Sequence, residues 1–120
     1  MDINEITYAI NGAIFEVSNC LGHGFLEKVY ENALVVELKS KGFKVENQVP
    51  MTVHYKGTPV GEYFADIVVE NKVIIELKSV SNINHFHEAQ LLNYLKATGT
   101  KVGLLVNFKN PKVEIKRMIY

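Results

Sequence analysis

Residues 64–78 read FADIVVENKVIIELK, and this stretch decides the fold. Two apolar runs of strand-forming residues flank the polar residues 70–72, a pattern that predicts a β-hairpin. Side chains alternate between the two faces of a strand, so Glu76 and Lys78 share one face. Asp66 interrupts the preceding apolar run in the same way. The hairpin is therefore expected to carry three ionisable side chains in a buried setting.

The length of the turn determines which residues meet. If residues 70–72 form a three-residue loop, Asp66 lies directly opposite Glu76, with Cβ atoms about 5 Å apart. A two-residue loop would place the two acids on opposite faces. We predict the three-residue loop. Two carboxylates in a half-buried site repel each other, so the pair requires a shared proton or a cation.

Oxygen donors alone suit a hard divalent cation such as Mg²⁺ or Mn²⁺. Lys78 beside that cation could orient or help deprotonate an attacking water. The alternative is an ion pair between Glu76 and Lys78 that stabilises the sheet. Only this Glu-x-Lys combines a buried strand with an upstream aspartate, although the pattern also occurs at Glu37–Lys39, Glu70–Lys72 and Glu114–Lys116.

The rest of the chain supplies helices on both sides of the hairpin. Apolar residues recur in helical steps over 3–21 and 26–41, with Gly42 as a cap, and a third helix is expected over 84–97. The expected strands lie on either side of Pro50 and at 60–69, 73–78, 102–107 and 113–119. This order, ααββββαββ, predicts an α/β or α+β domain with one mixed sheet.

The composition is that of one ordinary globular domain covering residues 1–120. Thirteen basic and thirteen acidic residues balance, which argues against a protein that coats nucleic acid by bulk charge. The single cysteine, Cys20, excludes a disulfide framework and a cysteine zinc site. No signal peptide or membrane-spanning run is recognisable, so we expect a cytoplasmic protein without membrane contact.

Asp66 followed by Glu76-Leu77-Lys78 on a hairpin resembles the PD-(D/E)XK nuclease superfamily. More closely, LGHGFLEKVYENAL at 21–34 resembles the signature of the GxxExxY protein family, and HEAQLLNYL at 87–95 with GLLVNF at 103–108 is similar to its C-terminal half. Two positions depart from the pattern, Ala65 and His23, where proline is expected. The resemblance implies a restriction-endonuclease-type fold.

The resemblance also implies roles for individual residues. The implied metal ligands are Glu27, Asp66, Glu76 and the backbone carbonyl of Leu77, with Lys78 acting on the attacking water. The implied substrate-binding residues are Tyr30, His87, Gln90 and Tyr94. Without the family, Glu27 is explained as a solvated helix residue, Gln90 and Tyr94 as part of an amphipathic helix, and His87 equally well as a helix-start residue.

These features predict a Mg²⁺-dependent nuclease that hydrolyses phosphodiester bonds in nucleic acid, with DNA as the expected substrate. The alternative is a nucleic-acid- or protein-binding module that keeps the nuclease fold without turnover. A protein partner that supplies specificity and a homodimer are both compatible with a chain of 120 residues.

Overall fold

A mixed five-stranded sheet forms the middle layer of the protein in a computed structural model that covers residues 1–120. In chain order the elements are α1 Ile3–Leu21, α2 Glu27–Ser40, β1 Val45–Tyr55, β2 Thr58–Val69, β3 Val73–Lys78, α3 His85–Thr98, β4 Val102–Asn107 and β5 Glu114–Ile119. The strands lie in the order β1-β2-β3-β4-β5. All neighbours are antiparallel except β3 and β4, which are parallel because α3 connects them.

The element order is ααβββαββ, with one strand fewer before α3 than the sequence predicts. The predicted break at Pro50 is wrong, because β1 continues through this residue, which lies opposite Phe64. Proline has no N–H to donate, but β1 is an edge strand, and an edge leaves some backbone groups without a strand partner. The α+β class with one mixed sheet is confirmed.

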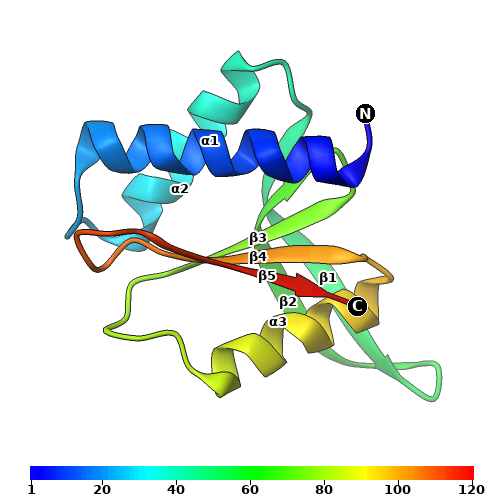
Figure 1. Ribbon diagram of the computed structural model, residues 1–120. Coiled ribbons are helices and arrows are strands. Elements are labelled where there is room, and N and C mark those ends of the chain that lie inside the picture. The colour runs from blue at the N-terminus through cyan, green and yellow to red at the C-terminus, as the bar shows by residue number, and fades with distance from the viewer.

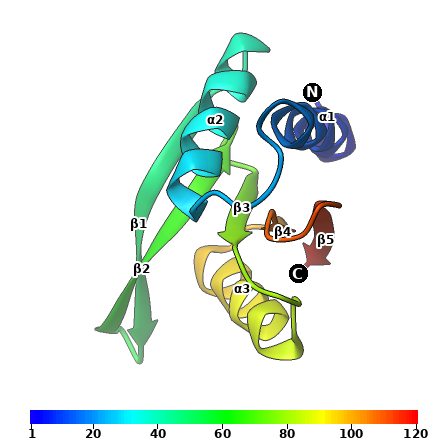
Figure 2. The same ribbon diagram turned by 90° about the vertical axis from the view of Figure 1, so that its left-hand side faces the viewer.

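The helices cover both faces of the sheet. Helices α1 and α2 pack on one face and α3 on the other, as Figures 1 and 2 show. A core of 19 buried residues, including Ile75, lies on the α1–α2 side, and a core of six, including Ile74, lies on the α3 side. These two neighbours on β3 therefore point to opposite faces, as the strand period requires. No helix is both long and apolar enough to cross a membrane.

The ends of the helices agree with their sequence signals. Asp2 and Glu5 form the capping box that begins α1, and Asn84 and His87 form the one that begins α3. Gly99 ends α3 in the left-handed conformation at a φ of 71°. Local residue choice therefore sets these boundaries to within one or two positions.

The hairpin of β2 and β3 has the predicted register. Residues 70–72 separate the strands, and the ladder ends with Ile67 opposite Ile75. It stops one residue short of Asp66 and Glu76, which would be the next pair. The backbone at this point is therefore open to other hydrogen-bonding partners.

Candidate active site

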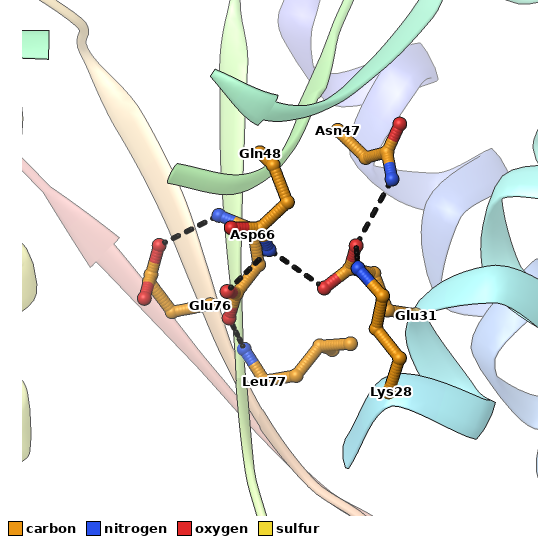
Figure 3. A network of polar contacts seen from close by, with 7 residues as sticks. All are labelled: Lys28, Glu31, Asn47, Gln48, Asp66, Glu76 and Leu77. Carbon is orange, nitrogen blue, oxygen red and sulfur yellow. Dashed lines mark hydrogen bonds and ion pairs between the residues drawn. The ribbon is translucent and has the colours of Figure 1, made fainter. Parts of the chain in front are cut away.

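Asp66 lies where the β2–β3 ladder ends. Its carboxylate accepts the hydrogen bond of a backbone N–H on β3 that has no partner in the ladder. Its Oδ2 accepts a hydrogen bond from the backbone N–H of Leu77 at 2.8 Å, and its Oδ1 accepts one from Gln48 Nε2 at 3.4 Å, as Figure 3 shows. Ala65 packs on the α3 side of the sheet, whereas Ile67 packs on the α1–α2 side. Regular alternation would put these two on the same face, so β2 twists at Asp66.

Glu76 is buried, with 8% of its surface exposed, and it turns toward α3. Its Oε1 accepts hydrogen bonds from the hydroxyl of Tyr63 and from the backbone N–H of Asp66 at 3.3 Å. Tyr63 in turn stacks on Tyr94 of α3, with ring centroids 3.4 Å apart. The predicted pair of carboxylates on one face is therefore wrong. The twist at Asp66 directs its side chain toward Gln48, and the Glu76 carboxylate points elsewhere (Figure 3).

Three carboxyl groups in this region have raised pKa values. Burial raises the pKa of Glu76 to about 7, and the negative charge of Asp66 adds to the shift. Burial also raises the pKa of Asp66, and the charge of Glu31 acts in the same direction. The pKa of Glu27 rises because of burial first and the charge of Asp66 second. The site therefore concentrates negative charge that a cation would offset.

Lys78 is the positively charged residue of this site and is half-buried at the end of β3. Its positive charge opposes the rise in pKa of Glu27, Asp66 and Glu76, so it acts on all three acids. None of the ion pairs in the structure joins Lys78 to Glu76, so the predicted alternative of a sheet-stabilising pair is contradicted. The ammonium group is left available to a substrate or a water.

The candidate metal ligands are only partly assembled. Glu27 is the first residue of α2, and the electrostatic influence of Asp66 reaches it. No three His, Cys, Asp or Glu side chains are arranged to bind one metal ion, and Glu76 is turned to Tyr63 instead. The predicted set of Glu27, Asp66, Glu76 and the Leu77 carbonyl is therefore not gathered at one point. Oxygen donors with raised pKa values nevertheless fit the chemistry of Mg²⁺ or Mn²⁺.

Tyr30 is buried rather than exposed to a substrate. Only 1% of its surface is exposed, and its ring stacks on Phe108 with centroids 4.2 Å apart. Its hydroxyl donates to the carbonyl of Gly22 at 2.8 Å and accepts from the N–H of Phe25 at 3.2 Å. This burial contradicts the implied substrate contact. Tyr30 instead anchors the loop between α1 and α2, which leads into Glu27.

The implied substrate-binding residues of α3 have two different positions. His87 exchanges hydrogen bonds with Asn84 at the start of the helix, which confirms the helix-start interpretation of this residue. Gln90 and Tyr94 line a groove of about 480 Å³ together with the exposed ring of Phe86. Tyr94 is also stacked on Tyr63, so the groove adjoins the side chains that hold Glu76.

Three residues of the site are absent from the sequence predictions: Glu31, Gln48 and Tyr63. Glu31 is 4% exposed and follows Glu27 by four residues on α2, a spacing that puts both acids on one helix face and could have identified it. Tyr63 precedes Asp66 by three residues on β2, a spacing that does not predict a contact with Glu76 from the sequence. No local pattern marks Gln48 either, because its reach to Asp66 depends on an irregularity of β1.

Comparison with known proteins agrees with this fold. The family model of the PD-(D/E)XK nuclease superfamily matches residues 4–118. No curated protein matches the sequence. The crystal structure of SSO0001 is similar in fold, with a TM-score of 0.59 and 21% sequence identity over 78% of this chain and 50% of that chain. The chain thus spans half the length of that protein. Because the family model covers nearly the whole sequence, the chain belongs to the PD-(D/E)XK nuclease superfamily.

Proposed function

We propose that this protein is a metal-dependent nuclease that hydrolyses phosphodiester bonds in nucleic acid, with DNA as the substrate. The observation that carries the proposal is the meeting of Asp66 on β2 with Glu76 on β3, where the Asp66 N–H donates to Glu76 Oε1 at 3.3 Å and Lys78 follows on the same strand. The charge of Lys78 also opposes the rise in pKa of Glu27, Asp66 and Glu76. Phosphodiester hydrolysis with a divalent cation uses acidic oxygen donors and a nearby positive group for the phosphate. Membership of the nuclease superfamily supports the same chemistry.

Glu27, Asp66 and Glu76 would hold Mg²⁺ or Mn²⁺, with the backbone carbonyl of Leu77 as a further donor. When bound, such a cation polarises the phosphate and makes a water more acidic. When all three acids are ionised, they and Lys78 carry a net charge of −2, which a divalent cation neutralises. Glu76 would have to break its hydrogen bond with the Tyr63 hydroxyl in order to bind the cation.

The chain's own side chains would do the remaining work. The Lys78 ammonium orients the attacking water through an N–H donor and stabilises negative charge on the phosphate oxygens. Gln90 and Tyr94 contact substrate phosphate from the α3 groove, a role that their position beside Tyr63 supports. With a neutral total charge, binding depends on the cation and on such local contacts, and a protein partner or a second copy of the chain would extend the contact surface.

A second candidate function is a binding module that keeps the nuclease fold without cleavage. The orientation of Glu76 favours it, since this acid is hydrogen-bonded to Tyr63 and no three acidic side chains are arranged to bind one metal ion. Calorimetry with Mn²⁺ separates the two candidates. Metal binding supports the nuclease, whereas no binding at millimolar Mn²⁺ favours the module.

Cleavage assays with single-stranded and double-stranded DNA and with RNA test the nuclease directly. We expect cleavage with Mg²⁺ or Mn²⁺, none with a chelator, and a loss of about 100-fold or more in Lys78→Ala. Lys72→Ala is the matched control, because Lys72 also belongs to a Glu-x-Lys sequence but lies in the hairpin turn. Equal activity in wild type and Lys78→Ala would assign the cleavage to another site or to a contaminant.

A further inference from the structure

Gln48 connects a buried acid of α2 with Asp66. Its Nε2 donates to Glu31 Oε1 at 2.8 Å and to Asp66 Oδ1 at 3.4 Å. A side-chain amide carries two N–H donors, so one nitrogen can serve both carboxylates. Figure 3 shows Gln48 between the two acids. The contact gives α2 a direct influence on the orientation of Asp66.

Glu31 is itself firmly held. Lys28 Nζ donates to its Oε2 at 2.9 Å, and Asn47 Nδ2 donates to the same atom at 3.0 Å. Burial alone would raise the pKa of Glu31, but hydrogen bonds from Asn47, Lys28 and Gln48 outweigh it and lower the pKa. The carboxylate therefore stays charged and is a fixed acceptor for the Gln48 amide.

The backbone of Gln48 adopts an unusual conformation at the point where its side chain contacts Asp66. Its φ is 51°, in the left-handed region that residues with a side chain rarely adopt. Gln48 lies within β1 between Asn47 and Val49, which both pair with β2, so no turn requires this conformation. Strain that is retained at a non-turn position points to a function for the contact that it creates.

We propose that Gln48 and Glu31 are positioning residues that orient the Asp66 carboxylate toward the cation. The N–H of Leu77 holds Oδ2 and Gln48 holds Oδ1, so the plane of the carboxylate is set by both contacts. This inference rests on the nuclease function proposed above, since it assigns Asp66 to the cation. Side chains that support a metal ligand contribute about 10-fold to 100-fold to metal affinity or activity.

Gln48→Gly tests this role, because glycine adopts a positive φ without strain and removes the amide. Lys56→Gly is the matched control, since Lys56 has a φ of 49° in the turn between β1 and β2 and makes no contact with Asp66. Crystal structures, the midpoint temperature of unfolding, the Mn²⁺ affinity by calorimetry and the rate of DNA cleavage are measured for both variants and the wild type.

In Gln48→Gly we expect the Asp66 carboxylate to rotate or to take more than one orientation. The Mn²⁺ affinity falls about 10-fold or more, while the unfolding temperature does not fall. Lys56→Gly leaves the Mn²⁺ affinity and the orientation of Asp66 unchanged. An Asp66 side chain oriented as in the wild type, with unchanged Mn²⁺ affinity, would overturn the inference. So would a loss of activity that a lower unfolding temperature accompanies, since that outcome makes Gln48 merely structural.

If Gln48→Gly does not fold, Gln48→Asn replaces it in the same comparison. Asparagine tolerates a positive φ but is one methylene too short to bridge Glu31 and Asp66. A wild-type protein that cleaves no nucleic acid would contradict the proposed function alone. The orientation of Asp66 and the Mn²⁺ affinity would then still decide whether Gln48 positions it.

Discussion

The hydroxyl of Tyr63 donates a hydrogen bond to Oε1 of Glu76, and this contact holds the acid on the α3 side of the sheet. The Glu76 carboxylate points away from Gln48, which contacts Asp66 (Figure 3). If Glu76 binds a cation as proposed above, the cation has to compete with the Tyr63 hydroxyl for this carboxylate. Removing the hydroxyl tests this competition.

We predict that Tyr63→Phe binds Mn²⁺ more tightly than the wild type. A hydrogen bond to a charged group contributes about 1.5–3 kcal/mol, so its removal lowers the cost of turning Glu76 and increases affinity by about 10-fold to 100-fold. Calorimetry measures the change. Tyr94→Phe is the control, because it retains the Tyr63 hydroxyl and the stacked rings. Weaker binding in Tyr63→Phe would show that the hydroxyl supports the metal-bound state instead.

We predict that the protein loses stability as the pH rises from 5 to 8. Glu76 has an ordinary pKa of 4.5, and burial raises it to about 7 in the folded state. The folded state therefore holds the proton more tightly than the unfolded chain. Stability is therefore lost progressively between the unfolded pKa of 4.5 and the folded pKa of about 7, by about 3 kcal/mol in the free energy of unfolding, and levels off above pH 7.

Urea unfolding at several pH values measures this dependence, and Glu76→Gln provides the comparison. The variant keeps a neutral side chain of the same shape, so its stability should change much less over this range. Burial also raises the pKa values of Asp66 and Glu27, which adds a smaller dependence of the same sign. Wild-type stability that increases with pH between 5 and 8 would contradict the prediction.

We predict that Tyr30→Phe destabilises the protein by about 1–2 kcal/mol without changing KM for nucleic acid. The variant loses two hydrogen bonds to the loop, at Gly22 and Phe25, but keeps the ring stacked on Phe108. Urea unfolding and steady-state kinetics measure the two quantities. Tyr8→Phe is the control, since Tyr8 is 82% exposed. A higher KM with unchanged stability would restore Tyr30 as a substrate contact.

We predict that Asn107→Ala lowers the free energy of unfolding by about 3 kcal/mol, because it leaves several buried polar groups unpaired. Asn107 is fully buried and exchanges hydrogen bonds with both backbone groups of Val80, at 3.2 and 2.8 Å. It also donates to Glu114 at 2.9 Å. Denaturant unfolding measures the loss, and Asn93→Ala on the exposed side of α3 should change stability by less than about 0.5 kcal/mol. Equal effects would contradict the role of Asn107.

The element boundaries and the hairpin register follow from local chemistry. Capping residues such as Asp2 and Asn84 satisfy backbone groups only a few positions away, so the sequence alone marks these helix starts. The turn at residues 70–72 likewise determines the register next to it. Pro50 was misleading, because a proline breaks a central strand but not an edge strand, and the position of β1 in the sheet is a tertiary property.

Sequence alone thus identified which residues carry the chemistry: Asp66, Glu76 and Lys78 stand out as ionisable groups in apolar strands. Where their side chains point was decided only by the tertiary structure. The Asp66 side chain contacts Gln48, which also contacts Glu31 of α2, and Glu76 contacts Tyr63. Partners that are distant along the chain leave no local pattern in the sequence, because only the packed tertiary structure brings them into contact.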